Sequence, residues 1–458
     1  MTHTMRSILC VLACAAAPAA TAGFEPLLVF MQPEDAVSPS GMLIYEANPL
    51  QQLGRIEPTE AAIAQVGAGR PISAYHPLGS VPIDTGGCHV YACTHQEAGT
   101  EPRTFNWQVF RGTTPDGYHV TQWQEVLRNP QGPWLIESMI AYQQAARQIF
   151  FFTWSRHPRP EEGHALWGFA SPDGLTWRPL SDEPLYTEHD AFGGMWDART
   201  GRFLTAQVTQ EAFNKPHADN IGRERRRVLS IRTSQDGVHW EQVHEAGPDG
   251  MITPDTNDPP DIEFYRMQPF HYADRYLGVA NLYAASPLVP AKHGPHLTCE
   301  WWTSADGIRW QRPWRSVAAQ GQAPYAVKMT PMWFGKEMLF WIAGQVMGLP
   351  EYRVASIGAR SNAELSSRLI EMPARTLLLN ASAPAGQGLF NQAYVAVELR
   401  DEADRTIPGY EYDKCVLRAV DDTRIELRWE KRDGTELAGR KIRLRFYLRS
   451  ARIYALGH

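Results

Sequence analysis

Apolar and polar positions alternate along the chain in short runs of four to nine residues, and Gly, Pro and Asp separate these runs. Residues 134–142 (WLIESMIAY), 149–155 (IFFFTWS), 164–171 (HALWGFAS) and 175–180 (LTWRPL) form one such group. Val, Ile, Phe, Trp, Tyr and Thr dominate the runs, which favours strands. No helical periodicity of useful length interrupts them. Groups of four antiparallel strands that repeat along one chain predict a β-propeller.

One phrase recurs where the third strand of each group ends. Ser-x-Asp-Gly-x-x-Trp occupies residues 171–177, 234–240 and 304–310, and a looser copy lies at 113–123. Asp bonds nearby backbone in tight turns, and Gly supplies a positive φ. The Trp residues are expected to anchor the last strand of each group by burying apolar surface. The phrase therefore predicts a structural turn and no chemistry.

The repeats predict five blades. Residues 75–84, 88–95, 104–113 and 118–126 form the first blade, before the three that carry the phrase. Residues 325–334, 337–346, 352–359 and 368–373 are assigned to the fifth blade. The early runs 27–32 and 41–47 can close the ring or belong to a sixth blade, so both counts stay open.

The pattern changes from about residue 374, where apolar and polar residues alternate with a period of two. This alternation is typical of strands with one face in a core and one in water. The expected organisation is an all-β protein with a signal peptide at 1–22, a propeller at 23–373 and a C-terminal β-sandwich at 374–458. The sandwich is expected to stabilise the propeller, and carbohydrate binding is a second option for it.

The N-terminal segment and the composition restrict the expected cellular location of the protein and its expected binding partners. Arg6, an apolar stretch and small residues up to Ala22 predict a cleaved signal peptide and export to the periplasm or the outside. A lipid anchor on Cys14 is not expected, because Leu12 fits the lipidation pattern poorly. A net charge of −6 does not favour nucleic acid as a partner. No later stretch is both long and apolar enough to span a bilayer. The protein is expected to be a monomer without a cofactor. The cysteines that remain after cleavage are expected to be buried thiols: Cys88, Cys93, Cys299 and Cys415.

Several stretches carry a resemblance to a known group: 190–204 (DAFGGMWDARTGRFL), 225–240 (RRRVLSIRTSQDGVHW), 264–279 (FYRMQPFHYADRYLGV) and 443–456 (RLRFYLRSARIYAL). Together with the repeats, they resemble the five-bladed superfamily of glycoside hydrolase families 32 and 43. The resemblance covers most of residues 75–458 and implies a five-bladed propeller with carbohydrate-cleaving activity. The catalytic motifs Trp-Met-Asn-Asp-Pro, Arg-Asp-Pro and Glu-Cys are absent, so no catalytic residue is carried over.

Candidate catalytic residues come from aligning the blades on their second strands. Ionisable residues then recur at the start of each inner strand: His76, Glu137, Asp190, Glu263 and Lys328. Asp261 competes with Glu263, and Glu188 and His189 are alternatives to Asp190. Glycosidic cleavage needs one carboxylic acid that protonates the leaving oxygen and a second carboxylate that activates water or attacks the sugar. We therefore predict catalytic groups at the mouth of the channel: Glu137, Asp190, Glu263, Asp261 and His76.

The segment 213–227 is the most basic part of the chain, and an acidic sugar is one substrate class that it would suit. The candidate substrate-binding residues are Lys215, His217, Arg223, Arg227, Tyr265, His271 and Lys328. A solvated loop whose arginines pair with nearby acids is the alternative. His293 and His296 are weak evidence for a metal, and no metal site is predicted.

Three functions fit these features. The leading hypothesis is a secreted glycoside hydrolase that acts on a polysaccharide or oligosaccharide. The second is a lyase acting on a uronate, with Tyr265, His271 or His76 as base and an arginine that neutralises the carboxylate. The third is a propeller that binds carbohydrate without catalysis. The sequence specifies neither the sugar nor retention or inversion at the anomeric carbon.

Overall fold

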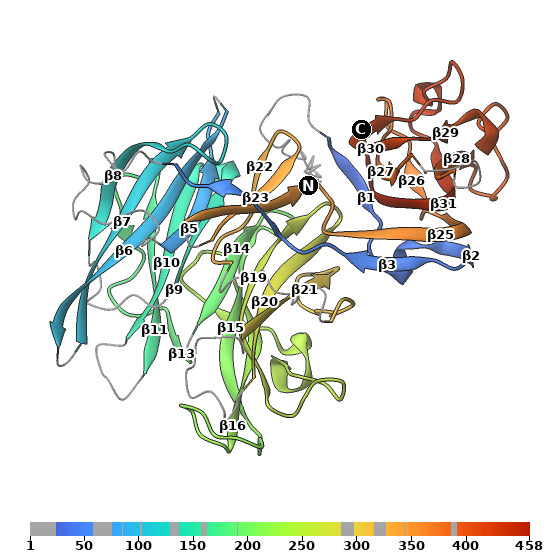
Figure 1. Cartoon of the computed structure of the whole chain (residues 1–458). Helices are drawn as coiled ribbons and strands as arrows, with labels where there is room; N and C mark the ends of the chain where they lie inside the picture. Colours follow the sequence, from blue (N-terminus) through green and yellow to red (C-terminus); the bar gives the residue numbers. More distant parts are fainter. Residues whose placement is uncertain are drawn as a thin grey trace, which may run out of the picture.

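The computed structural model describes residues 24–57, 76–84, 86–100, 103–128, 137–156, 163–189, 191–284, 297–315, 327–342, 344–385 and 392–458. Within these ranges the chain is all-β, and its helical segments are single 3-10 turns: η1 (Pro33–Asp35), η3 (Gln144–Ala146), η5 (His244–Ala246), η6 (Pro248–Gly250), η7 (Tyr412–Lys414) and η8 (Thr435–Leu437). Figure 1 shows two lobes, a larger one formed by the sheets of the first part of the chain and a smaller C-terminal one.

Five small antiparallel sheets make up the larger lobe in the described residues. The first contains β5 (His76–Pro82), β6 (Cys88–Thr100), β7 (Arg103–Thr114) and β8 (Thr121–Arg128). The second contains β9 (Glu137–Gln143), β10 (Gln148–Arg156), β11 (His164–Ser171), β12 (Arg178–Pro179) and β13 (Tyr186–Glu188). Both sheets follow the predicted strand runs closely.

The third and fourth sheets also keep chain order. The third contains β14 (Phe192–Asp197), β15 (Arg202–Ala212), β16 (Arg225–Ser234), β17 (Glu241–Gln242) and β18 (Met251–Ile252). The fourth contains β19 (Ile262–Tyr272), β20 (Arg275–Ala284) and β21 (Leu297–Ser304). The first strands of consecutive sheets lie against one another, in the order β5, β9, β14 and β19. They therefore form the inner wall of the propeller.

The fifth sheet is closed by a strand from the beginning of the chain. β22 (Met332–Phe334), β23 (Glu337–Ile342) and β24 (Gln345–Pro350) pair in order, and β4 (Gln51–Arg55) then pairs with β24. The prediction that 352–359 and 368–373 complete this blade is wrong. Since β4 fills the outer edge of β24, those residues are available to pair with the C-terminal strands instead.

Five apolar clusters seal the ring, because each one lies between two neighbouring sheets. The cluster that joins the last blade to the first packs Val90 and Val120 against Met332, Leu339 and Trp341. Each of the five sheets thus packs against a neighbour on either side, which confirms the five-bladed arrangement. The sixth blade that the sequence left open is not present in the described residues.

The smaller lobe is organised around one long strand, β31 (Lys441–Gly457). Its strands form a single hydrogen-bonded, ten-stranded sheet: β1 (Pro26–Val29), β2 (Val37–Gly41), β3 (Ile44–Ala47), β25 (Ala355–Ser366), β26 (Ile370–Glu371), β27 (Leu378–Ala383), β28 (Tyr394–Arg400), β29 (Val416–Leu417), β30 (Val420–Glu426) and β31. The early runs 27–32 and 41–47 thus contribute to this lobe and not to the ring. A β-sandwich in the strict sense stays a prediction.

The repeated phrase forms the same turn in each copy. In the second blade, Asp173 Oδ1 accepts hydrogen bonds from the backbone N–H groups of Leu175 (2.8 Å) and Thr176 (2.9 Å), while Ser171 Oγ accepts the N–H of Gly174 (2.7 Å). The copies at Asp236, Asp306 and Asp116 show the same bonds. The carboxylates are thus occupied by backbone, which supports the structural interpretation of the phrase.

The tryptophans of the phrase contribute to packing between blades. Trp177 lies 6.1 Å from the ring of Tyr91, which belongs to the preceding blade, and Trp240 lies 5.5 Å from Phe152 of the blade before its own. Edge-to-face ring pairs of this kind add stability beyond simple burial. Each Trp therefore fastens its blade to the previous one, in addition to anchoring its own last strand.

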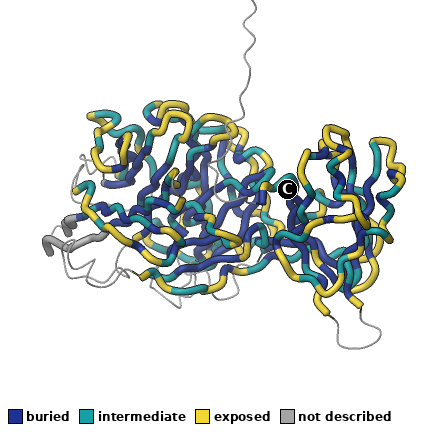
Figure 2. The backbone as a smooth tube through the Cα atoms, turned by 90° about the horizontal axis from the view of Figure 1, so that it is seen from above, coloured by how far each residue is buried: buried dark blue, intermediate teal, exposed yellow. Residues whose placement is uncertain are grey.

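Burial follows the two lobes. Figure 2 shows buried strands inside both lobes and exposed turns around them. Cys88, Cys93, Cys299 and Cys415 are buried, as predicted. In the part of the chain that the structure describes, no helix has the length and apolar character needed to cross a membrane.

Candidate functional site

The inner strands all begin at the same face of the propeller. Each blade is an antiparallel meander, so every inner strand runs in the same direction, and the repeated turns after the third strands lie at the opposite face. His76 is the first residue of β5, Glu137 is the first of β9, and Glu263 is the second of β19. This face, which we call the mouth, therefore collects the predicted ionisable residues.

Glu137 is held between two cations at the mouth. Lys328 Nζ lies 3.1 Å from Glu137 Oε1, and Arg266 Nη1 lies 3.3 Å from Glu137 Oε2. The side chains of Glu137 and Lys328 keep 12% and 19% of their surface exposed, whereas Arg266 keeps 2%. The three groups come from three blades, so their meeting point lies at the propeller axis. Glu137 and Lys328 remain within reach of a ligand.

Arg266 was not predicted, and an irregularity in β19 explains why. The pairing with β20 shifts register between Phe264 and Arg266, which makes Tyr265 a β-bulge. Because of the bulge, Phe264 and Met267 both enter the core cluster although they are three residues apart. The phase of the strand changes there, and Arg266 turns into the channel. Bulges of this kind commonly re-aim side chains near functional sites.

Arg266 is held by one group from the neighbouring strand β14 and by one from its own strand. Its Nε donates to the backbone oxygen of Phe192 (3.1 Å), and its Nη2 donates to Gln268 Oε1 (3.3 Å). Burial lowers the pKa of Arg266, and the carboxylate of Glu137 opposes this shift. The guanidinium therefore acts as a rigid cation beneath Glu137. A rigid neighbour restricts Glu137 to one orientation, as catalysis requires of a reacting carboxylate.

His76 lies beside this group and is neutral at pH 7. Desolvation by the surrounding protein is the main cause, and the charge of Lys328 adds to it, so that the pKa of His76 falls to about 4 despite the opposing charge of Glu137. Its ring keeps solvent access at the beginning of β5. A neutral imidazole can accept a proton or a hydrogen bond from a ligand.

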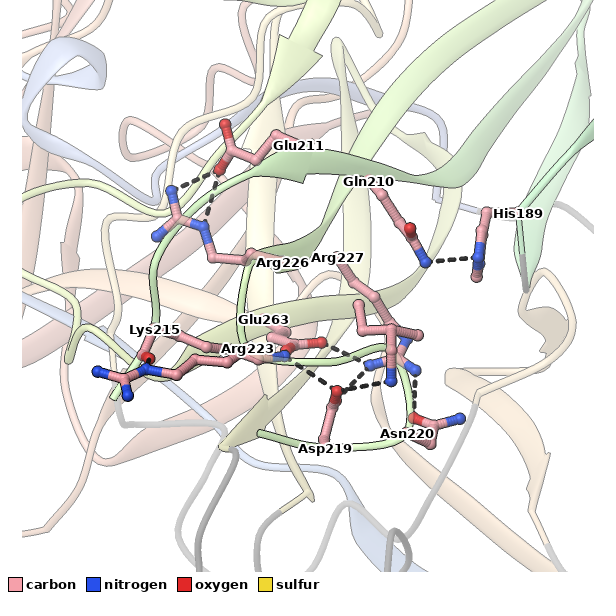
Figure 3. Close-up of polar contacts among 11 residues, drawn as sticks. His189, Gln210, Glu211, Lys215, Asp219, Asn220, Arg223, Arg226, Arg227 and Glu263 are labelled. Atoms are coloured by element: carbon pink, nitrogen blue, oxygen red, sulfur yellow. Dashed lines mark hydrogen bonds and ion pairs between the residues drawn. The ribbon is translucent and has the colours of Figure 1, made fainter. Parts of the chain in front are cut away.

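Glu263 belongs to a different network of polar contacts (Figure 3), whose central side chains are fully buried. Lys215 Nζ donates to one of its oxygens, and Arg227 Nη1 donates to Glu263 Oε2 (2.6 Å). Asp219 completes the network by accepting from Lys215 (3.0 Å) and from Arg227 (2.7 Å), and Asn220 accepts from Arg227 Nη2 (2.6 Å). The side chains of Glu263, Lys215 and Arg227 have no exposed surface.

This network changes the interpretation of the basic segment 213–227. Lys215 and Arg227, which were predicted to bind substrate, connect Asp219 of this segment to Glu263 of β19. Arg223 donates its Nε to the backbone oxygen of Lys215 (2.9 Å) and stays exposed, and His217 is half-buried on the same loop. The segment thus fits the alternative that the sequence left open, in which its cations pair with nearby acids.

The remaining candidates are dispersed. Asp261 is half-buried and has no ion-pair partner among the described residues. Tyr265 lies 5.4 Å below the guanidinium of Arg227, at the bulge. Asp190, His293 and His296 lie outside the described residues. Glu188, the alternative to Asp190, accepts from Arg232 Nη2 (2.9 Å) and from Thr209 (3.1 Å).

His271 does not lie at the mouth. It stands at the other end of β19, where its Nε2 is 2.9 Å from Asp197 Oδ1. Tyr276 and Thr200 also donate to the Asp197 carboxylate. These residues link the turn after β14 to the turn after β19 at the opposite face. His271, which was predicted to bind substrate or to act as the base of a lyase, therefore lies at the face opposite the mouth.

Metal ligands are not clustered in the described part of the chain. No group of three or more His, Cys, Asp or Glu side chains is placed there to hold an ion. Glu137, Lys328 and His76 are described groups at the mouth that a ligand can reach, and Arg266 lies behind them.

Comparisons with known proteins give similarities of shape only. No protein-family profile and no curated protein sequence matches the chain. Among solved structures, the GH32 beta-fructofuranosidase of Bombyx mori is 9% identical, with a TM-score of 0.38 over 87% of this chain and 97% of that chain. An exo-beta-1,3-galactanase of Phanerochaete chrysosporium is 9% identical, with a TM-score of 0.38 over 91% and 100%. A family 117 glycoside hydrolase of Zobellia galactanivorans is 10% identical, with a TM-score of 0.37 over 58% and 74%.

Proposed function

We propose that the protein is a carbohydrate-active enzyme that cleaves glycosidic bonds at the mouth of its propeller, with Glu137 as a catalytic carboxylate. The observation that carries this proposal is the position of Glu137 at the axis, partly exposed and held between Lys328 and Arg266. A carboxylate fixed by cations from two other blades is oriented for chemistry on a ligand. Glu263, which is buried and bonded at both oxygens, is better suited to holding the loop.

Hydrolysis needs a second carboxyl group beside Glu137. Asp190 and Asp261 are the candidates, because Asp190 lies two residues before β14 in the sequence and Asp261 directly precedes β19. Asp261 is half-buried and unpaired within the described residues, which leaves its carboxyl group available. Lys328 is the partly exposed cation of the site, so it is the group that would contact an oxygen or an anionic substituent of the sugar.

The test is a substrate screen with single-residue variants. Wild-type protein is assayed on a panel of polysaccharides and aryl glycosides, with products separated by chromatography. We expect Glu137→Gln to lower kcat/KM on the responsive substrate by about a hundredfold or more. The matched control is Asp84→Asn, which changes an exposed carboxylate that pairs with Arg147 and should leave activity unchanged.

Two results would count against hydrolysis at this site. Near-normal activity of Glu137→Gln, in a protein with an unchanged circular dichroism spectrum, removes Glu137 from catalysis. Tight binding of an oligosaccharide without any turnover by the wild type supports the third function, a propeller that binds without cleaving. If Glu137→Gln does lose activity, the variants Asp190→Asn and Asp261→Asn decide which carboxyl group acts with Glu137.

A lyase is the second candidate, and the neutral His76 is the observation in its favour. Elimination on a uronate needs a base and a cation that neutralises the sugar carboxylate. His76, whose lowered pKa keeps it unprotonated at pH 7, and the nearby Lys328 could supply these two roles. Elimination creates an unsaturated uronate that absorbs ultraviolet light, whereas hydrolysis does not. The absorbance of the products therefore distinguishes the two mechanisms.

Export, cleavage near Ala22 and a monomeric state stay predictions from the sequence. Mass spectrometry of the mature N-terminus and light scattering of the purified protein test them.

A further inference from the structure

The C-terminal lobe presents a sheet face that the proposed function does not use. Along β31, Ile442, Leu444, Phe446 and Leu448 enter the core of this lobe, so the side chains between them point outward. The outward residues of β31 are Arg443, Arg445, Tyr447 and Arg449. β28 and β25 flank this part of β31 on its two sides. We call this surface the outer face.

The outer face carries an excess of positive charge. Its arginines are Arg443, Arg445 and Arg449 on β31, Arg400 on β28 and Arg418 directly after β29. Three carboxylates pair with these arginines: Glu364 with Arg445 (2.5 Å), and Glu398 (2.7 Å) and Asp404 (3.2 Å) with Arg400. Arg443 and Arg418 have no ion-pair partner among the described residues, so positive charge remains in excess on this face. The whole chain has a net charge of −6, so the excess is specific to this surface.

Part of this charge costs stability. Arg400 lies directly opposite Arg443 in the pairing of β28 with β31. Like charges that face each other across two strands destabilise a sheet. Arg400 is compensated by Glu398 and Asp404, whereas Arg443 has no ion-pair partner among the described residues. An arginine placed where it weakens the sheet points to a role in binding and not in folding.

Tyrosine rings stand among the arginines. Tyr412, which is 49% exposed, lies 4.8 Å from Tyr447 on β31. Tyr394, opposite Arg449 in the strand pairing, lies under the guanidinium of Arg418 at 5.2 Å. Rigid rings with a polar tip offer flat contact surfaces at small entropic cost. Arginine forks recognise carboxylate and sulfate groups by paired hydrogen bonds.

We propose that the outer face binds an acidic polysaccharide, that is, a glycan chain bearing carboxylate or sulfate groups. Successive outward side chains of β31 are about 7 Å apart, so a linear polyanion laid along the strand meets one arginine after another. The tyrosines supply the contacts to sugar rings that a bare basic patch lacks. The net negative charge of the rest of the chain favours this local, ordered contact over general adhesion to polyanions. The surface is a binding site separate from the mouth, and it does not depend on what the mouth catalyses.

The test measures binding of the full-length protein to defined polymers. Affinity is measured by isothermal titration with polygalacturonate and a sulfated galactan as acidic probes and a neutral glucan as the uncharged probe. The double variant Arg443→Gln with Arg449→Gln should lose about tenfold or more in affinity for the acidic polymers. The control variant Arg375→Gln with Arg428→Gln removes the same charge from exposed arginines paired with Glu25 and Glu426, and should bind as the wild type does.

Several outcomes would overturn the proposal. Equal affinity of wild type and the Arg443 and Arg449 double variant removes the outer face from binding, as does equal affinity for the neutral glucan. Loss of binding in Lys328→Met, with binding retained in the double variant, places the polyanion at the mouth instead. Binding to duplex DNA or to phosphatidylglycerol vesicles, with no binding to the acidic glycans, assigns the face to another class of partner. Tyr412→Ala, which leaves the charge unchanged, should also weaken glycan binding and so separates ring contact from charge.

Discussion

Single carboxylates that look alike in the sequence have different surroundings in the folded chain. Glu137 and Glu263 both stand at the beginning of an inner strand, and both were predicted to be catalytic. Glu137 remains partly exposed, whereas Glu263 is covered by Lys215, from the loop between β15 and β16, and by Arg227 of β16. The alignment of the blades on their second strands could predict that acids gather at the mouth. It could not predict which acid the loop would neutralise, because ion pairing depends on the packing of that loop.

The two glutamates should therefore respond differently to the same change. Glu263→Gln leaves Lys215 and Arg227 with one carboxylate fewer in a fully buried network, and breaking such a pair costs about 3 kcal/mol of unfolding free energy. Glu137→Gln should lower activity and change stability by much less, since its side chain is partly solvated. Urea unfolding and substrate turnover, measured on both variants, check this. Equal loss of stability in the two variants would contradict the assignment.

Asp197 gives a prediction for acid stability. Burial alone raises the pKa of this carboxyl group, but hydrogen bonds from His271, Thr200 and Tyr276 outweigh burial and lower the pKa to about 2 from 3.8. Because the folded pKa is the lower one, the stabilisation is complete above pH 3.8 and is lost as the pH falls towards 2. The shift corresponds to about 2 kcal/mol. Asp197→Asn should be less stable at pH 7, and the difference from wild type should close between pH 4 and 2 in denaturant titrations.

At the scale of elements, the repeated turn explains how the blades are held to one another. The glycine of each phrase has a positive φ, and it also lies against the preceding blade. A Cβ on Gly174 would be 2.0 Å from the hydroxyl oxygen of Tyr91, and one on Gly307 would be 3.0 Å from Leu204. The sequence showed the need for a positive φ, because Asp-Gly is a turn signal. The close approach of the next blade could not be seen in a local pattern.

Two glycine variants separate these requirements. Gly201 has a φ of +66° and open space around its Cβ position, whereas Gly174 has a φ of +70° and the Tyr91 contact. Gly201→Ala should cost about 1 kcal/mol from the backbone alone. Gly174→Ala should cost about 2 kcal/mol more, because Tyr91 or the turn must move. Thermal unfolding of both variants measures the difference, and equal melting temperatures would show that the contact between blades carries no energy.

Strand identity was largely predictable and strand partnership was not. Most runs from 88 to 350 were placed correctly because each strand pairs with its neighbour in the chain. β25 was assigned to the fifth blade, yet it pairs with β31, β2 and β3. β4 was not predicted as a strand at all, since Gln51–Arg55 carries little apolar signal and is stabilised mainly by its partner β24. Pairing across hundreds of residues leaves no trace in local periodicity.

At the scale of the whole molecule, the two lobes are joined by the first part of the chain, which supplies strands to both, and by a partly buried ion pair. Glu351, which follows the last propeller strand β24, accepts from Arg424 (2.6 Å) and Thr423 (2.8 Å) of β30. The first part of the chain supplies β1, β2 and β3 to the C-terminal sheet and β4 to the propeller. The lobes should therefore unfold in a single transition, although the pattern of apolar and polar residues differs between them.

Truncation at the predicted boundary tests this coupling. A chain that ends after Pro373 loses β31 and so leaves β1, β25 and β26 without their main partner. We expect this fragment to be insoluble or to lack a cooperative unfolding transition, because apolar strand faces would be exposed. A soluble fragment with the near-ultraviolet circular dichroism of a folded propeller would show that the larger lobe is independent. The full-length protein, prepared in the same way, is the control.

Strands from the beginning of the chain pair with strands that are synthesised late, and this pairing determines when each sheet can form during translation. β1 leaves the ribosome among the first strands, and its partner β31 is among the last; Glu46 and Arg452, which pair at 2.5 Å, are 406 residues apart. β4 must likewise wait until β24 has been made. The ring of blades can therefore close only after β24 (Gln345–Pro350) has been made, and the smaller lobe only after β31 (Lys441–Gly457), so the first strands wait for their partners during most of the synthesis. We expect such a chain to depend on chaperones that shield its apolar strands until the last segment emerges.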